Sequence, residues 1–210
     1  QKITTVDICV YGGTSAGVMA AYTASKSGKT VLLIEQGKQL GGLSSGGLGY
    51  TDIGNKYAVT GLARDFYRRI GSHYGKLEQW IFEPHVAEET FQYYISQEKV
   101  NVLYEHQIIS AKKEKGVIQE IVIENSSHSS AATNQVIRAK MFIDCSYEGD
   151  LMAKAGVSYT VGREANAQYN ETYNGVQLRD KHQFLDGIDP YKIQGKPESG
   201  LLWGISNETL

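Results

Sequence analysis

The first 35 residues combine two short apolar runs with one stretch of small residues between them. The run over 6–11 is mostly apolar, which is typical of a strand covered on both faces. Small residues over 14–27 allow a closely packed helix, and Gly28 suits its end. The run over 31–34 predicts a second buried strand. Strand, turn, helix and strand in this order indicate a right-handed crossover unit.

Later segments continue the mixed pattern. A helix is predicted over 59–70, where apolar residues recur every fourth position, and another over 84–98, which begins at a proline. The other predicted elements are a buried strand over 100–104, a hairpin of 107–113 and 117–124, strands over 136–139 and 141–145, and a short helix over 150–155. Residues 36–57 and 125–134 are interpreted as loops, and the periodic signal fades after 162.

This order of elements predicts an α/β protein with a Rossmann-like domain over 1–162, built on a central parallel sheet. A small antiparallel β-hairpin or meander is expected as an insertion at 105–139. Residues 163–210 are interpreted as the start of a truncated substrate domain, so we expect the fold to be incomplete at the C-terminus.

Composition narrows the class of protein. The chain has 21 basic and 23 acidic residues, a net charge of −2, which argues against a basic face for nucleic acid. No stretch approaches the roughly 18 apolar residues that a membrane span requires. Glycine is abundant, at 23 residues against 3 prolines, and clusters in the first third of the chain. This clustering suggests backbone brought close to a ligand.

Two cysteines, Cys9 and Cys145, lie in predicted buried strands. We interpret both as small core residues and not as a disulfide scaffold. No metal site is predicted.

The strongest chemical signal is the glycine turn between the first strand and the first helix, formed by Gly12, Gly13, Thr14, Ser15, Ala16 and Gly17. In the dinucleotide fingerprint G-x-G-x-x-G, the first glycine makes the turn, the middle one admits the pyrophosphate and the last packs helix against strand. Thr14 stands in place of the middle glycine. We expect the hydroxyls of Thr14 and Ser15 to donate to phosphate, beside the amides of the helix N-terminus.

Glu35 strengthens this interpretation because it ends the second strand, where an acid accepts hydrogen bonds from ribose hydroxyls. Its charge also disfavours a 2′-phosphate, so an NADP-type ligand is not expected. The first 35 residues alone leave FAD and NAD both open.

A second glycine loop, formed by Gly41, Gly42, Leu43 and Ser44, follows Glu35. The spacing Glu-x5-Gly-Gly resembles the FAD-type extension of the glutathione reductase superfamily. More closely, the chain resembles the FAD-dependent oxidoreductase family whose members are often labelled xanthan lyases. The resemblance covers almost the whole chain and is carried by residues 11–17, 41–49, 61–69, 82–87, 144–153 and 156–164.

The resemblance implies an FAD cofactor with its pyrophosphate over the glycine turn and its adenosine ribose on Glu35, next to Gln36. It places the second glycine loop beside the cofactor. It also implies that the backbone of Gln107 and Ile108 lies near adenine. A second cofactor-facing turn is expected to contain the residues Ser146, Gly149 and Asp150.

By the same resemblance, the expected activity is flavin-dependent oxidation or reduction of an unidentified small substrate, carbohydrate-related if the family label is a guide. Three alternatives stay open: an NAD-dependent dehydrogenase, a polysaccharide (xanthan) lyase and a non-catalytic fragment. No catalytic residue is identified. Side chains that are candidates to line a site near the flavin ring, each with a packing or surface alternative, are Arg64, Tyr67, His85, Glu148 and Arg163.

Family members are longer, so the chain is interpreted as an N-terminal fragment that is inactive and holds FAD weakly by itself. An exposed sheet edge would favour self-association or pairing with the missing C-terminal portion. A periplasmic or secreted location is expected over a cytoplasmic one. This expectation follows the usual location of the family that the chain resembles, and the start of the chain at Gln1 and not at Met.

Overall fold

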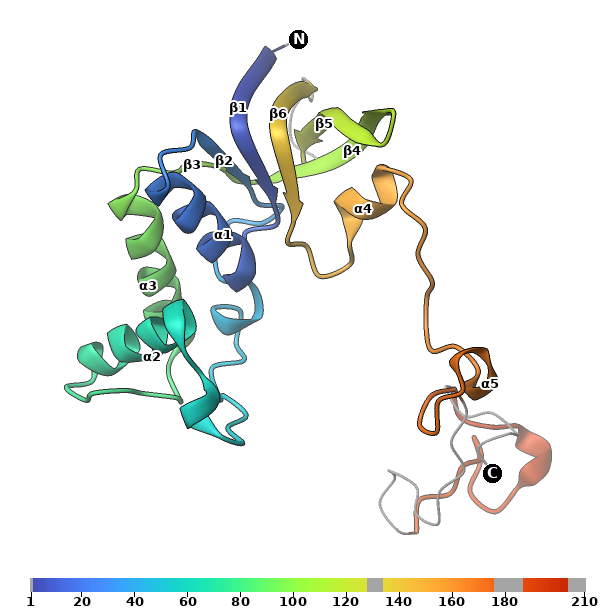
Figure 1. Ribbon diagram of the computed structural model, residues 1–210. Helices are drawn as coiled ribbons and strands as arrows, with labels where there is room; N and C mark the ends of the chain where they lie inside the picture. The colour runs from blue at the N-terminus through green and yellow to red at the C-terminus, as the bar shows by residue number, and fades with distance from the viewer. Residues whose placement is uncertain (1, 128–133, 176–186, 204–210) are drawn as a thin grey trace. The chain divides into compact units, whose positions relative to one another are not determined.

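The computed structural model describes residues 2–127, 134–175 and 187–203, which belong to two units, 1–158 and 159–210. The first unit contains a six-stranded sheet with the order β3-β2-β1-β6-β5-β4 (Figure 1). Its strands are β1 (Lys2–Tyr11), β2 (Val31–Ile34), β3 (Asn101–Leu103), β4 (His106–Glu114), β5 (Val117–Asn125) and β6 (Gln135–Asp144).

The strands β3, β2, β1 and β6 run parallel. At the carboxyl end of β1, Tyr11 pairs with Ile34 of β2 on one side and with Asp144 of β6 on the other. The chain leaves β1 toward β2, whereas β6 lies on the opposite side of β1. This reversal is the switch point at which open α/β sheets bind ligands, beyond the carboxyl ends of the strands.

Each face of the parallel strands is buried by a different set of elements. Val10 and Leu33 pack with α1 (Ser15–Lys26), α2 (Gly61–His73) and α3 (Pro84–Gln97). Cys9, Tyr11 and Ile34 point to the other face, where they pack with the antiparallel strands and with α4 (Asp150–Lys154). Burial on both faces explains why β1 and β2 end in uninterrupted apolar runs.

The predicted hairpin is present as β4 and β5, which pair in the antiparallel direction. Its turn residues Lys115 and Gly116 have φ angles of 49° and 83°, the left-handed conformation that two-residue hairpin loops favour. The hairpin continues the main sheet, because β5 pairs with the first half of β6.

The prediction of two strands over 136–139 and 141–145 was wrong, because β6 is one strand that ends at Asp144. Lys140 interrupts the apolar run, but its exposed side chain forms an ion pair with Asp7 (Nζ–Oδ1 2.7 Å) without breaking the strand. The strand β1 likewise starts at Lys2, before its apolar run, because residues from Lys2 onward pair with β6.

The remaining elements are short. They include the 3₁₀ turns η1 (Gly42–Ser44) and η2 (Lys56–Ala58) in the first unit, and α5 (Asn166–Tyr169) and η3 (Pro197–Ser199) in the second. Part of the loop predicted at 125–134, residues 128–133, lies outside the described residues. The assignment of 163–210 to a substrate domain stays a prediction. Within the described ranges, no helix has the length and apolar character to cross a membrane.

Candidate cofactor site

The glycine turn leaves β1 at the carboxyl edge of the sheet and is packed tightly against its neighbours. A Cβ atom on Gly12, whose φ is +98°, would lie 2.7 Å from the backbone of Cys145 and Ser146. A Cβ atom on Gly17 would lie 1.8 Å from the carbonyl oxygen of Gly12. Both glycines are therefore needed where the fingerprint predicts them, one for the turn beside β6 and one for the contact of α1 with β1.

The side chain of Thr14 points into the protein. Its buried hydroxyl donates to the carbonyl of Cys145 (2.9 Å) and accepts a hydrogen bond from the amide of Gly17 (3.3 Å), which caps α1. In this structure the proton of the hydroxyl has its acceptor within the protein, and a hydrogen bond from Thr14 to phosphate stays a prediction. Ser15 and Ala16, in the first turn of α1, are half-buried and exposed, respectively.

The Glu35 carboxylate reaches the glycine turn from the end of β2. Its Oε2 accepts from the amide of Gly13 (2.7 Å) and its Oε1 from the amide of Gly37 (2.6 Å). A carboxylate has about four acceptor positions, so these two bonds leave room for ribose hydroxyls. Because Glu35 is half-buried beside the turn, it stands where a dinucleotide fingerprint needs its acid.

The second glycine loop lies directly against the glycine turn. The amide of Gly41 donates to the carbonyl of Gly13 (2.8 Å). On its other side, Gly41 is so close to the ring of Phe91 in α3 that a Cβ atom would come within 2.2 Å of it. The loop is thus fixed at Gly41, while Leu43 is exposed.

Asp144 organises the loop between β6 and α4 (residues 145–149, the β6–α4 loop). Its Oδ1 accepts from the amide and the hydroxyl of Ser146, and its Oδ2 accepts from the amide of Met152 (2.8 Å). The sequence Asp-x-Ser is a signal for such a turn. The prediction of Cys145 as a buried strand residue was wrong, since it is half-buried and follows the end of β6. Burial raises the pKa of its thiol.

Two of the predicted site residues donate to the hydroxyl of Tyr11, which was not predicted as a site residue, and a third is bonded to one of them. The Gln36 side-chain amide donates to the Tyr11 hydroxyl (2.5 Å) and to the Asp150 carboxylate (3.1 Å). The backbone amide of Ile108 donates to the same hydroxyl (3.1 Å). Burial raises the pKa of Tyr11, which keeps the phenol neutral. The side chain of Gln107 instead donates to Glu124 of β5 (2.9 Å).

Tyr147 was also missed. Its hydroxyl accepts a hydrogen bond from the amide of Leu43 (2.7 Å), so the β6–α4 loop contacts the second glycine loop. Tyr147 lies between Ser146 and Gly149, which were predicted to face the cofactor. This position is the sequence signal that could have identified it as a site residue.

The candidates for catalysis are scattered. Arg64 forms a two-point ion pair with Glu78 (2.6 and 3.0 Å), and the ring of Tyr67 stacks on Trp80 with 4.0 Å between centroids. His85 is exposed in the first turn of α3, and Glu148 is exposed in the β6–α4 loop. Arg163 belongs to the second unit. Within the part of the chain that the structure describes, no group of three or more His, Cys, Asp or Glu side chains is placed to hold a metal ion.

The fold and this edge of the sheet define a dinucleotide-binding protein of the Rossmann-like class. A sequence model described as FAD dependent oxidoreductase matches residues 7–199. The chain therefore belongs to the FAD dependent oxidoreductase family: it is a flavoprotein of the oxidoreductase class, and its cofactor is FAD. Among curated proteins, none matches the sequence.

Solved structures share the fold at low sequence identity. The THI4 protein of Thermovibrio ammonificans is 20% identical, with a TM-score of 0.53 over 76% of this chain and 67% of that one. A geranylgeranyl bacteriochlorophyll reductase-like protein of Thermoplasma acidophilum is also 20% identical, with a TM-score of 0.53 over 74% of this chain and 43% of that one. L-proline dehydrogenase from P. horikoshii is 13% identical, with a TM-score of 0.55 over 78% of this chain and 59% of that one. The chain thus spans about two thirds of the first structure and less of the other two.

Proposed function

We propose that the chain holds FAD across the carboxyl ends of β1, β2 and β6, with the diphosphate on the glycine turn and the adenosine ribose on Glu35. The observation that supports this placement most directly is the approach of the Glu35 carboxylate to the amide of Gly13, at 2.7 Å. An acid held there by the backbone is positioned for ribose hydroxyls before any ligand arrives, which lowers the cost of ordering it.

The other predicted site residues lie around the same edge of the sheet. The second glycine loop flanks the diphosphate, and the Gln107 and Ile108 backbone lies toward the adenine. Gln36 and Asp150, which are hydrogen-bonded to each other, close the adenosine end, beside the turn that contains Ser146 and Gly149. In this arrangement the protein binds and orients the cofactor and excludes water from it.

Bound FAD supplies the redox chemistry itself, so we propose flavin-mediated oxidation or reduction of a small, carbohydrate-related substrate. Membership of the family supports the redox part. The substrate class rests on the sequence resemblance alone. Neither the family match nor the fold neighbours support the NAD-dependent dehydrogenase or the polysaccharide lyase. The whole protein's substrate and partners are proposals as well, because the chain spans only part of its fold neighbours.

Calorimetric titration with FAD, NAD and ADP tests the placement. FAD is expected to bind with one-to-one stoichiometry, and ADP to compete with it because the diphosphate and ribose contacts are shared. NAD is expected to bind much more weakly than FAD. FAD binding that ADP does not displace would contradict the assignment of the adenosine to Glu35, and equal affinity for NAD would contradict the cofactor preference.

A further inference from the structure

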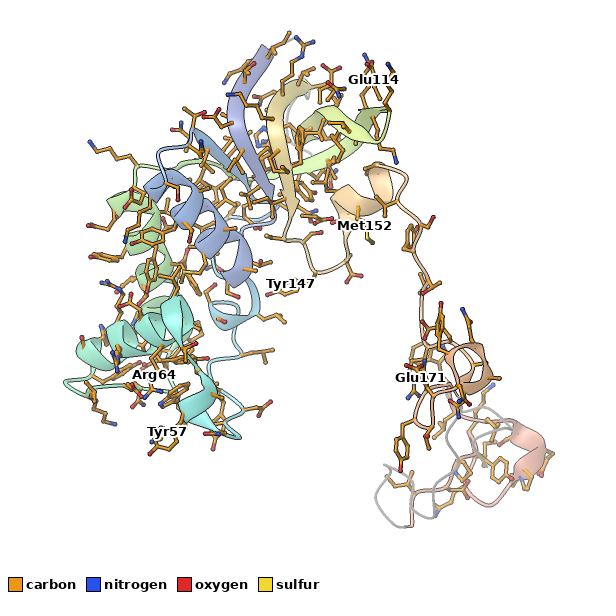
Figure 2. All side chains as sticks on the ribbon, in the orientation of Figure 1. Tyr57, Arg64, Glu114, Tyr147, Met152 and Glu171 are labelled. Carbon is orange, nitrogen blue, oxygen red and sulfur yellow. The ribbon has the colours of Figure 1, made fainter. Side chains whose placement is uncertain are left out.

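Two hydrogen bonds of Cys145 anchor the β6–α4 loop to the end of β1 and to the glycine turn. The amide of Cys145 donates to the carbonyl of Tyr11 (2.7 Å), and the carbonyl of Cys145 accepts from the Thr14 hydroxyl (2.9 Å). Two residues further on, Tyr147 lies at the protein surface and is 60% exposed. Figure 2 shows this side chain between the β6–α4 loop and the segment that holds the second glycine loop, where its hydroxyl is bonded.

The hydroxyl of Tyr147 contacts the second glycine loop. It accepts from the amide of Leu43, and a Cβ atom on Gly42 would lie 2.2 Å from the same oxygen. Glycine at position 42 therefore leaves room for the phenol. Since the amide of Gly41 bonds to Gly13, the second glycine loop is tied to the glycine turn at one end and to Tyr147 at the other.

An exposed side chain gains little net stability from one hydrogen bond, because water competes for the same groups and the rotamer freedom of the side chain is lost. Folding of the domain therefore does not explain why this contact is made. Its position does, because both loops that it joins are bonded to the glycine turn: the amide of Gly41 donates to the carbonyl of Gly13, and the carbonyl of Cys145 accepts from Thr14.

We propose that Tyr147 is a positioning residue for the cofactor: its hydroxyl joins the β6–α4 loop to the second glycine loop on the exposed side of the diphosphate and thereby slows the release of FAD. This inference rests on the proposed function, since it requires FAD on the glycine turn. Tyr147 acts through the amide of Leu43, by keeping the two loops together while the cofactor is bound.

The first test is the rate of FAD release from the Tyr147→Phe flavoprotein, followed by flavin fluorescence after dilution. Release is expected to be roughly 3- to 10-fold faster than in the wild type, the range that the net contribution of one hydrogen bond allows. The rate of FAD association and the thermal midpoint of the apoprotein are expected to stay unchanged. The matched control is Tyr57→Phe, which alters a phenol that is 76% exposed on η2 (Figure 2) and should release FAD at the wild-type rate.

A second variant, Gly42→Ala, tests the same contact from the opposite loop. Its methyl group displaces the Tyr147 hydroxyl but keeps the tyrosine, and it also strains the backbone, because Gly42 has a φ of +56°. Release at least as fast as that of Tyr147→Phe is therefore expected. The double variant should release FAD no faster than Gly42→Ala, because the Tyr147 contact can be removed only once. Three results would each overturn the proposal. The first is a double variant whose release rate is raised by the product of the two single effects. The others are a wild-type release rate in Tyr147→Phe, and a lower thermal midpoint of its apoprotein together with slower FAD association.

The inference and the proposed function fail in different ways. If ADP displaces FAD but Tyr147→Phe releases FAD at the wild-type rate, only the role of Tyr147 is refuted. If ADP does not displace FAD and Gly12→Val binds FAD as the wild type does, the site itself is misplaced.

Discussion

Thr14 stands where the dinucleotide fingerprint has its middle glycine. Its hydroxyl is directed into the protein, to the carbonyl of Cys145 and the amide of Gly17. The turn stays narrow because the added side chain is buried. The residue therefore links the end of β6 to the start of α1. In the proposed site, this leaves the diphosphate to the backbone amides.

Replacement of Thr14 by valine should lower the free energy of unfolding by about 1–2 kcal/mol, because it removes the cap of α1 and leaves the Cys145 carbonyl without its donor. Thr14→Ser keeps the hydroxyl and is the matched control; it loses only a buried methyl group, so a smaller loss of about 0.5–1 kcal/mol is expected. Denaturant unfolding followed by circular dichroism measures both. Equal stability of the valine variant and the wild type would show that the hydroxyl contributes nothing.

At the scale of residues, the sequence identified those candidate site residues whose positions follow from spacing along the chain. Gly12, Gly17 and Glu35 were identified because a fingerprint fixes their distances along the chain. Tyr11 and Tyr147 were not, because their hydroxyls bond to Ile108 and Leu43, which lie far from them in sequence. Such contacts depend on which loops meet after the sheet has formed.

At the scale of elements, the packing of α1 on β1 depends on the absence of a side chain at Gly17. Gly17→Ala places a methyl group against the Gly12 carbonyl, and we expect a loss of about 1–3 kcal/mol in stability together with weaker FAD binding. Gly54→Ala is the control, since a Cβ atom there would meet no atom within 4 Å. Thermal unfolding with and without FAD measures the effect, and a Gly17→Ala midpoint equal to that of Gly54→Ala would contradict it.

The helix α2 is joined to the segment that follows it by the ion pair of Arg64 and Glu78. The hydrogen bond from Arg64, with a second from Arg68, lowers the pKa of Glu78 below its ordinary value of 4.5. A carboxyl whose pKa is lowered in the folded state stabilises the fold above its unfolded pKa, and this stabilisation is lost as the pH falls through the folded value.

Glu78→Gln should therefore be less stable than the wild type near neutral pH. As the pH falls below 4.5, the difference should shrink. Thermal midpoints measured across this range for both proteins test the expectation. Two curves that stay parallel down to the acid limit would show that the Glu78 charge does not stabilise the fold.

The prediction of elements succeeded where the pattern was local and failed where pairing extended a strand. The hairpin was readable from two β-rich runs around Lys115 and Gly116. The length of β6 was not, because Lys140 breaks the apolar run and its ion pair with Asp7 of β1 depends on the sheet. The strand order was also not readable, since β6 pairs with β1 across more than one hundred residues of chain.

At the scale of the whole molecule, the first unit contains all the predicted cofactor-binding residues, and its sheet brings most of them to one edge. In the second unit, the described residues form only α5, η3 and an isolated bridge between Tyr191 and Leu201, and the assignment of 163–210 to a substrate domain stays a prediction. Catalytic residues could not be predicted, because a flavin carries the redox chemistry and leaves its protein surroundings free to vary.

The central claim is that the adenosine of FAD is held by Glu35 at the end of β2, and calorimetric titration of FAD into Glu35→Ala tests it most directly. The substitution should weaken binding by about 1–3 kcal/mol, because charge-assisted bonds to the ribose are lost. Glu114→Ala, which removes an exposed carboxylate at the end of β4 (Figure 2), should bind FAD like the wild type. If Glu35→Ala binds FAD as tightly as the wild type, the adenosine lies elsewhere and the proposed site is wrong.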